Sequence, residues 1–169
     1  MKIVPVLDNI RSSYNVGAIL RTAEGLGVTQ VICSGYTPFP NEGSGRLPHV
    51  VEKERSAIHK TALGAETMLK LEYAKSLSKR LTELKEQGYK LAGLENNLAD
   101  ERIVALNNPQ LKERLGERVA LVLGEEVCGI SQSILEMLDV LIEIPMLGQK
   151  ESFNVSVAAG IALYQLQLL

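Results

Sequence analysis

The stretch Leu141-Ile-Glu-Ile-Pro-Met-Leu-Gly-Gln-Lys-Glu-Ser-Phe-Asn-Val-Ser-Val-Ala-Ala-Gly160 contains the strongest structural signal in the chain. Its first four residues are apolar apart from one glutamate and predict a buried strand. Pro145 favours an end to this strand because proline has no N–H group to donate, and a polar loop follows. The remaining residues predict a helix that opens with Ser152, Asn154 and Ser156 among apolar neighbours. Uncharged hydroxyls and an amide at the start of a helix favour a site for a small polar ligand.

Short apolar segments alternate with helical segments over the rest of the chain. Apolar residues at spacings of three and four predict a first helix, with Asn15 as its N-cap and Gly27 just beyond its end. We expect strands at residues 3–7, 31–32, 90–94, 119–123 and 140–144, and further helices at residues 74–87 and 131–138. This alternation predicts an α/β fold whose mainly parallel sheet has helices on both faces. No linker or repeat interrupts residues 1–169, which we expect to form a single domain.

The composition is that of an ordinary globular protein. The chain has 169 residues, of which 46% are hydrophobic and 22% charged, and its formal net charge is −2. This balance excludes a broad cationic coat for nucleic acid, although it leaves room for a local patch. Cys33 and Cys128 have no CxxC partner, so we expect two buried free thiols in a reducing compartment and no metal site. No N-terminal apolar segment is long enough for a signal peptide.

The last 18 residues, from Ser152 onwards, carry no charge, so a membrane span has to be considered. The lack of basic residues beside this segment argues against a membrane span. The polar side chains within it argue against lipid exposure as well: Asn154, Ser156, Gln165 and Gln167. We therefore expect a buried or interface helix, no membrane association and a cytoplasmic protein.

Two more clusters place polar residues among apolar ones. In the first, Arg21 is expected to project away from the apolar face of its helix, and Gly17, one turn earlier, is expected to clear space beside it. A guanidinium with open space around it suits a phosphate or a developing oxyanion, although most helix arginines are simply solvated. The second cluster, residues 122–130, follows a buried strand, where glycines let a ligand approach the backbone. Within it, Glu125 is better explained as a solvated surface residue.

The segment around Pro145 forms the third cluster. The main-chain groups there are expected to be unclaimed by a neighbouring strand, so they could bind a flat heterocycle by its edge. Met146 and Phe153 could pack on the faces of that ring. Helix capping is the alternative explanation for Ser152 and Asn154, and it accounts for one of them more easily than for all the polar groups.

In this order, the three clusters resemble the motifs of the SpoU (TrmH-like) family of RNA 2′-O-ribose methyltransferases, in the SPOUT superfamily. The first motif matches Asn15-Val-Gly-Ala-Ile-Leu-Arg-Thr-Ala23, and the second matches Leu123-Gly-Glu-Glu-Val-Cys-Gly-Ile-Ser131. The third matches Ile144-Pro-Met146 together with Ser152-Phe-Asn-Val-Ser-Val-Ala158, and residues 60–65 resemble a further family segment. The resemblance covers nearly the whole chain.

The resemblance implies an α/β domain with a trefoil knot near its C-terminus, a homodimer as the working unit and S-adenosylmethionine as the cofactor. It implies a cofactor pocket lined by Leu94, Gly124, Ile144, Met146, Ser152 and Phe153. The position of Leu94 is open to a shift of one residue, to Gly93 or Glu95. Some members of the family carry an extra RNA-binding domain, and we expect none here.

By the same resemblance, the reaction is the attack of a ribose 2′-hydroxyl of tRNA or rRNA on the sulfonium methyl group. The family motif gives Arg21 the central role, which is easier to accept as oxyanion stabilisation because a guanidinium stays protonated. Asn15, Glu126, Ser152 and Asn154 are expected to orient the ribose and this arginine. Glu52 and Glu54 reduce the positive charge around the expected site. The basic residues near this site are nevertheless candidates for RNA contact: Arg11, Arg46, Lys53, Arg55, Lys60 and Lys150.

Three other functions remain open at the level of sequence. One is a base methyltransferase with the same knotted fold, although the Asn-x-Gly-x-x-x-Arg motif of residues 15–21 favours ribose. The chain could be an RNA-binding or assembly protein that kept the fold but lost activity, although all five polar site residues are present. It could also be a small nucleotide-dependent oxidoreductase, but a GxGxxG motif in the right context is missing. The sequence indicates neither the RNA nor the nucleotide that is modified.

Overall fold

The computed structural model describes residues 1–96 and 99–169. Within these residues, seven strands form one sheet in the order β3-β2-β1-β6-β4-β7-β5. All neighbouring strands run parallel, which confirms the predicted sheet type. The strands are β1 Lys2–Asp8, β2 Gln30–Ser34, β3 Lys70–Ala74, β4 Lys90–Leu94, β5 Ile103–Ala105, β6 Arg118–Leu123 and β7 Val140–Glu143.

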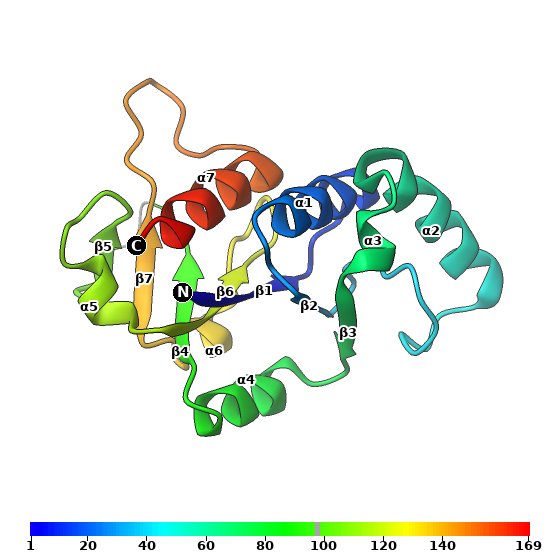
Figure 1. The fold of residues 1–169 in the computed structure, drawn as a ribbon, viewed down its shortest axis with the longest axis horizontal. Coiled ribbons are helices and arrows are strands. Elements are labelled where there is room, and N and C mark those ends of the chain that lie inside the picture. Colours follow the sequence, from blue (N-terminus) through cyan, green and yellow to red (C-terminus); the bar gives the residue numbers. More distant parts are fainter. Residues whose placement is uncertain (97–98) are drawn as a thin grey trace.

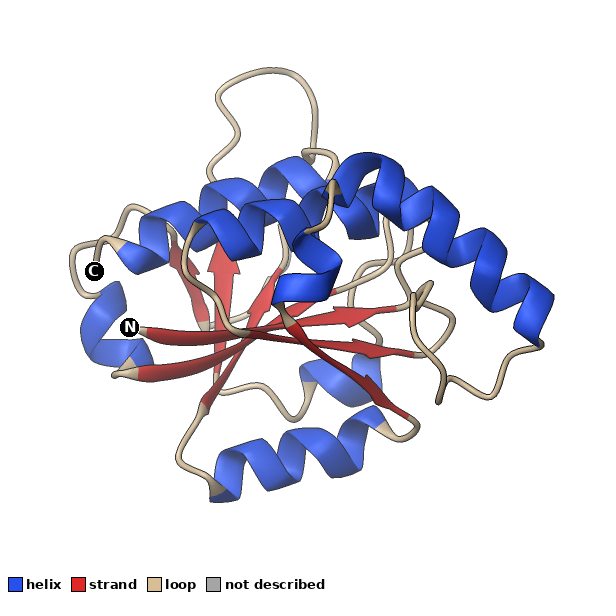
Figure 2. Cartoon of the chain, turned by 45° about the vertical axis from the view of Figure 1, so that its right-hand side comes forward, coloured by secondary structure: helices blue, strands red, loops and turns tan. Residues whose placement is uncertain are grey.

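Helices lie on both faces of the sheet, as the sequence predicted. Figures 1 and 2 show α1 and α7 side by side over one face and α4 on the opposite face. Helix α2 continues this first layer beyond the edge of the sheet and packs against α1 (Figure 1). The helices are α1 Ser13–Gly25, α2 Pro48–Ala62, α3 Ala65–Met68, α4 Leu77–Glu86, α5 Leu111–Leu115, α6 Gln132–Leu135 and α7 Val155–Gln167.

The central strands alternate between two hydrophobic cores because successive side chains of a strand point to opposite faces. In β6, Val119, Leu121 and Leu123 pack into the core beneath α1, α5 and α7. Ala120 and Val122 pack into the second core, against α4 and α6. Burial on both sides explains why β6 reads as an almost unbroken aliphatic run.

Several helix ends differ from the sequence prediction. Asn15 is not the N-cap of α1, because Ser12 takes that position and its Oγ accepts a hydrogen bond from the Asn15 amide. The predicted helix 74–87 begins only at Leu77, after Ser76 as N-cap. The predicted helix 131–138 shortens to α6, where the Arg102 guanidinium donates hydrogen bonds to the carbonyls of Leu135 and Leu138. Helix α2 was not predicted.

Gly17 has a different role from the predicted one. It is buried where α1 crosses α2, and a β-carbon there would collide with the Ile58 carbonyl oxygen and with Thr61. The glycine therefore permits close approach of the two helices and does not clear space beside Arg21. The contact fixes α1, whose N-terminal turn carries Asn15, against the rest of the fold.

The uncharged C-terminal segment forms α7, which packs against α1. Its buried residues belong to the core above the sheet: Ala159, Ala162, Leu163 and Leu166. Among the described residues, no helix combines the length and apolar character that crossing a bilayer requires.

Candidate functional site

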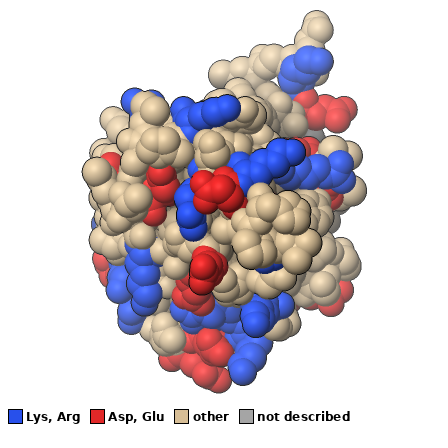
Figure 3. Space-filling view, turned by 90° about the vertical axis from the view of Figure 1, so that its right-hand side faces the viewer, with Lys and Arg blue, Asp and Glu red and all other residues tan. Residues whose placement is uncertain are grey.

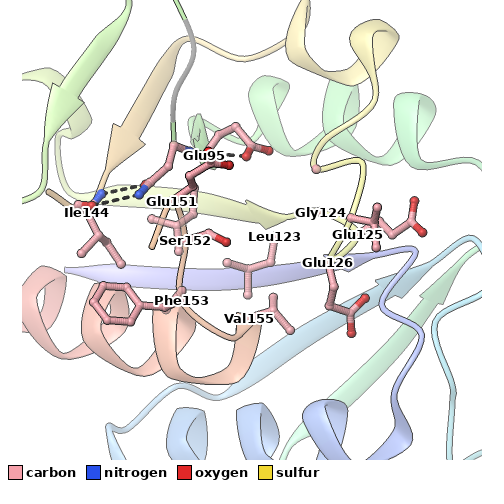
Figure 4. A pocket seen from close by; sticks show the side chains of 15 residues that line it. Glu95, Leu123, Gly124, Glu125, Glu126, Ile144, Glu151, Ser152, Phe153 and Val155 are labelled. Carbon is pink, nitrogen blue, oxygen red and sulfur yellow. Dashed lines mark hydrogen bonds between the residues drawn. The ribbon is translucent and has the colours of Figure 1, made fainter. Parts of the chain in front are cut away.

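The candidate site lies at the carboxyl edge of the sheet, where ligands bind in parallel α/β folds. Strands β1, β6, β4 and β7 are consecutive neighbours, so the loops that follow them meet at this edge. The loop after β6 and the segment between β7 and α7 form two walls of an open pocket (Figure 4). The two clusters 122–130 and 144–158, which are separate in sequence, therefore share one site.

The pocket has an open volume of about 860 Å³, mouth included. Figure 4 shows Ile144 and Phe153 towards one end and Glu125 and Glu126 towards the other. The pocket combines apolar side chains with carboxylates, and none of the described residues that line it is a lysine or an arginine. The lining residues are Leu94, Glu95, Asn96, Leu123, Gly124, Glu125, Glu126, Val127, Gly129, Ile144, Glu151, Ser152, Phe153, Val155 and Ala158.

Most residues expected to hold the cofactor line this pocket. Leu94, Gly124, Ile144, Ser152 and Phe153 all do so, whereas Met146 is half-buried outside the lining. Leu94 and Glu95 both face the pocket. Gly93 instead approaches the side chains of Ile130, Leu138 and Leu141, which excludes it from the pocket lining.

A hydrogen-bonded network joins the three sequence clusters. The Asn15 amide nitrogen Nδ2 donates to Glu126 Oε1 at 3.1 Å, across 111 residues of sequence. Asn154 Nδ2 donates to Asn15 Oδ1 at 3.3 Å, across 139 residues. The second Glu126 oxygen accepts a hydrogen bond from the Arg11 main-chain amide at 3.3 Å. Three of the predicted polar residues therefore lie together beside the pocket.

Helix capping explains part of the third cluster, as the sequence allowed. Asn154 is the N-cap of α7, and its Oδ1 accepts hydrogen bonds from the Ser156 main-chain amide at 2.9 Å and from Ser156 Oγ at 2.7 Å. The same side chain uses its Nδ2 to contact Asn15. Ser152 lies outside the helix and lines the pocket. Helix capping by Asn154 and a ligand site that includes Ser152 are therefore both compatible with this cluster.

Arg21 stands apart from this network. It is exposed on α1, away from the pocket lining, and within residues 1–96 and 99–169 its side chain makes no hydrogen bond or ion pair. Its neighbour Thr22 faces α7, where a β-carbon on Gly160 would lie 3.5 Å from Thr22 Cγ2. A single chain therefore brings Asn15, Glu126, Ser152 and Asn154 to the site but leaves Arg21 beside α7.

Gly124 serves the loop itself rather than the approach of a ligand. A β-carbon there would lie 2.5 Å from the Ile130 amide nitrogen and 2.6 Å from the Gly129 carbonyl oxygen. The loop closes on itself through two hydrogen bonds between the main chains of Glu125 and Gly129, at 2.9 and 3.1 Å. Gly124 thus leaves the space that the main chain of Gly129 and Ile130 needs in order to pack against it.

The main-chain groups of Ile144 are not free, contrary to the expectation from sequence. The Asn96 side chain donates to the Ile144 carbonyl oxygen at 3.0 Å and accepts from the Ile144 amide at 3.1 Å (Figure 4). Since β7 ends at Glu143, this carboxamide takes the place of a neighbouring strand. Sequence reasoning missed Asn96 because its partner lies 48 residues away.

Glu125 is a site residue and not a solvated one, which corrects the sequence interpretation. It lines the pocket and forms an ion pair with Arg11. Desolvation alone would raise the pKa of this carboxyl. Hydrogen bonds with Tyr36 and Cys128 and the charge of Arg11 outweigh desolvation, so the Glu125 pKa lies below its ordinary value.

The two cysteines differ in environment, so the prediction of two buried thiols was wrong for one of them. Cys33 is buried, and desolvation raises its pKa to about 12. Cys128 is exposed in the loop after β6. A hydrogen bond to Glu125 raises the pKa of the Cys128 thiol.

Acidic residues interrupt the basic residues near the site. Figure 3 shows Lys and Arg intermixed with Asp and Glu on the side of the molecule that carries α2. Glu54 pairs with Arg46 at 2.6 Å and Glu52 with Arg55 at 3.0 Å, which confirms the dilution predicted from sequence. Both histidines, His49 and His59, are exposed on α2.

A family model described as the SpoU rRNA Methylase family matches residues 2–164. The chain belongs to this family. It is 37% identical over 160 residues to the 23S rRNA (guanosine-2′-O-)-methyltransferase RlmB of Xylella fastidiosa, covering 95% of this chain and 56% of that protein. The SpoU-family chain thus spans little more than half the length of the curated relatives it matches.

Solved structures share the fold of this SpoU-family chain. The TrmH/SpoU tRNA modifying enzyme of A. aeolicus superposes with a TM-score of 0.76 and 24% identity, covering 99% of this chain and 74% of that one. An AdoMet-bound rRNA methyltransferase from Sinorhizobium meliloti superposes with a TM-score of 0.74 and 21% identity, covering 97% and 55%. At these identities the superpositions support the fold.

Proposed function

We propose that this chain is an S-adenosylmethionine-dependent RNA methyltransferase domain that modifies a ribose 2′-hydroxyl of tRNA or rRNA. The observation that carries the proposal is the network of Asn15, Glu126 and Asn154, which joins the three family motifs beside one pocket. Curated relatives named as guanosine-2′-O-methyltransferases of rRNA support the same reaction. All five polar residues of the family motifs are present, which argues against an RNA-binding or assembly protein that kept the fold but lost activity.

The pocket suits S-adenosylmethionine in shape and charge. Leu94, Leu123, Ile144 and Phe153 offer an apolar surface for the adenine ring. Four glutamates line the pocket: Glu95, Glu125, Glu126 and Glu151. Their negative charge favours the positively charged sulfonium and ammonium groups of this cofactor over anionic ligands such as dinucleotides. When bound, this cofactor supplies an electrophilic methyl group.

A direct test fills the pocket from helix α7. Ala158 is half-buried and lines the pocket, so Ala158→Trp is expected to remove measurable binding of S-adenosylmethionine in titration calorimetry. The wild-type protein is expected to bind with micromolar affinity. Ser78→Trp, at an exposed position of α4 on the other face of the sheet, is the matched control and should bind like wild type. A folded wild-type protein that does not bind this cofactor would overturn the proposal.

The chain's own residues divide the work of the reaction. Both Glu126 oxygens accept hydrogen bonds, from Asn15 and from the Arg11 amide, so this carboxylate is held in place to orient its neighbours. The Ser152 hydroxyl faces the pocket and is placed to contact the ribose or the cofactor. Arg21 is proposed to stabilise the negative charge that develops on the ribose oxygen as its proton leaves.

We propose that the working unit is a homodimer that contacts its partner through α7. One face of α7 carries exposed apolar residues at spacings of four, three and four, which form the α7 stripe: Val157, Ile161, Tyr164 and Leu168. Arg21 adjoins this face, since its neighbour Thr22 packs beside Gly160. Dimerisation through the stripe would therefore bring Arg21 of each chain to an interface near a site.

The dimer is tested by a charge in the centre of the α7 stripe. Ile161 is 37% exposed, so Ile161→Glu should leave the fold intact while making burial of the stripe costly. Sedimentation equilibrium is expected to give a dimer for wild type and a monomer for the variant. An exposed control, Met68→Glu on α3, should remain dimeric. A monomeric wild-type protein at micromolar concentration would contradict the proposal.

Three finer points belong to the same proposal. The family fold implies a trefoil knot. The position of α7 supports this knot, because α7 follows β7, next to the β5 edge of the sheet, and yet packs on α1 from the start of the chain.

A cytoplasmic location is supported by the free thiols and by relatives that act on rRNA. RNA recognition by local contacts, or with a partner, is supported by the lack of a broad basic surface on the α2 side (Figure 3).

A further inference from the structure

Two adjacent side chains at the end of β4 connect the two walls of the pocket. Glu95 Oε2 accepts a hydrogen bond from the Ile130 amide at 2.9 Å, which holds the loop after β6. Asn96 binds both main-chain polar groups of Ile144, which holds the segment after β7. The Asn96 amide also donates to Glu95 Oε1 at 3.3 Å and links the two contacts. Figure 4 shows Glu95 between Ile144 and the loop that carries Gly124.

The Asn96 side chain extends the sheet beyond its last main-chain contact. Strands β4 and β7 pair up to Leu94 and Ile142, and the Glu95 amide donates to the Ile142 carbonyl at 3.0 Å. A carboxamide offers the same donor and acceptor as a peptide group, so Asn96 supplies one more rung opposite Ile144. On the other side of β7, the Leu106 amide binds the Glu143 carbonyl at 2.8 Å.

This rung lies where the chain leaves the sheet. Pro145 cannot continue the ladder, and the segment that follows projects from the fold (Figure 1), with Leu147 fully exposed. Among the described residues, no hydrogen bond from positions 145 to 150 is seen. Asn96 is therefore the polar contact that fixes the near end of the wall carrying Ser152 and Phe153.

The Glu95 contact depends on the conformation of the opposite loop. Gly129 has φ +68°, and a β-carbon there would lie 3.0 Å from Glu95 Cδ and closer still to Oε2. The loop thus adopts a backbone that glycine favours at the point where the Glu95 carboxylate reaches the Ile130 amide. Two contacts, one to each wall, therefore start from the two residues that directly follow β4.

We propose that Glu95 and Asn96 are positioning residues that hold the two walls of the pocket at the spacing that binds the cofactor. The inference rests on the proposed function, because the pocket is taken as the S-adenosylmethionine site. A site that is held open before binding loses less free energy on ordering its walls than one that must assemble around the ligand. Loss of either contact is therefore expected to weaken cofactor affinity.

The test uses Asn96→Asp, which keeps the size of the side chain but changes its hydrogen bonding. An ionised aspartate accepts from the Ile144 amide but cannot donate to its carbonyl, whereas a protonated one can do both. In calorimetry with S-adenosylhomocysteine, the variant is expected to bind about tenfold more weakly than wild type at about pH 8. The ratio should shrink as the pH falls towards about 4, which is near the ordinary pKa of an aspartate, because the carboxyl then becomes protonated.

The wild-type protein at each pH is the reference, because the pocket glutamates Glu95, Glu125, Glu126 and Glu151 are common to both proteins. Asn107→Asp, at an exposed turn outside the pocket, is the matched control and should follow wild type at every pH. Equal affinity of Asn96→Asp and wild type would overturn the inference, as would tighter binding by the variant. Weaker binding with no response to pH would also overturn it, by indicating general damage. Absence of binding by wild type would overturn the proposed function as well.

Discussion

Replacement of Arg21 by alanine is expected to lower the rate of methyl transfer by about 100- to 1,000-fold at saturating cofactor, because a preorganised donor to a developing oxyanion contributes about that much. Cofactor affinity should not change. The Arg21 side chain lies outside the pocket lining and makes no hydrogen bond or ion pair within the described parts of the chain, so neither the pocket nor the fold depends on it. The measurement is transfer of a labelled methyl group to unfractionated tRNA and rRNA, with calorimetry for cofactor binding.

Arg114 provides the control for this substitution. It is exposed on α5 and away from the pocket, so Arg114→Ala should leave both rate and affinity at wild-type values. Arg21→Lys keeps the charge but loses the planar fork, and we expect it to recover only part of the rate. An Arg21→Ala protein with wild-type activity would exclude this residue from the catalytic machinery.

Replacement of Gly124 by alanine is expected to weaken cofactor binding by about a hundredfold, which corresponds to about 3 kcal/mol of overpacking. The added methyl group meets backbone atoms of Gly129 and Ile130, which cannot rotate away as a side chain can. The loop after β6 must then open, and with it the wall that carries Glu125 and Glu126. Calorimetry with S-adenosylmethionine measures the effect, and thermal unfolding shows whether the fold persists.

Gly148 is the matched glycine for this experiment. It lies in the exposed segment between β7 and α7, a β-carbon there meets nothing within 4 Å, and its φ is not in the left-handed region. Gly148→Ala should therefore bind cofactor like wild type. If Gly124→Ala also bound like wild type, the loop after β6 would not need its close backbone contact, and the role we assign to Gly124 would be wrong.

The parallel sheet and most of the residues expected to hold the cofactor could be predicted from the sequence. The aliphatic run in β6 indicated burial on both faces, and the structure places its alternate residues in two cores. The family motifs identified Leu94, Gly124, Ile144, Ser152 and Phe153, all of which line the pocket. These features follow from local pattern, because periodicity and motif spacing are properties of neighbouring residues.

The misassigned residues share a physical cause, which is a partner distant in sequence. Asn15 was taken for a helix cap, but Ser12 caps α1 and leaves the Asn15 side chain free to bind Glu126. Gly17 was given a role beside Arg21, although its missing β-carbon is required by α2, a helix absent from the prediction. In both cases the sequence singled out the right residue and placed it on the right helix, but it assigned the wrong contact partner.

The sequence by itself determined the fold class, the family and several of the polar residues beside the pocket, such as Glu126 and Ser152, since these depend on pattern along the chain. Only the tertiary structure decided which residues hold the walls of the pocket in place. Strand order brings the ends of β4, β6 and β7 together, so Glu95 reaches Ile130 and Asn96 reaches Ile144. A side chain's hydrogen-bonding groups are fixed by its chemistry, but which donor or acceptor comes within 3 Å of them depends on how strands far apart in sequence lie next to each other.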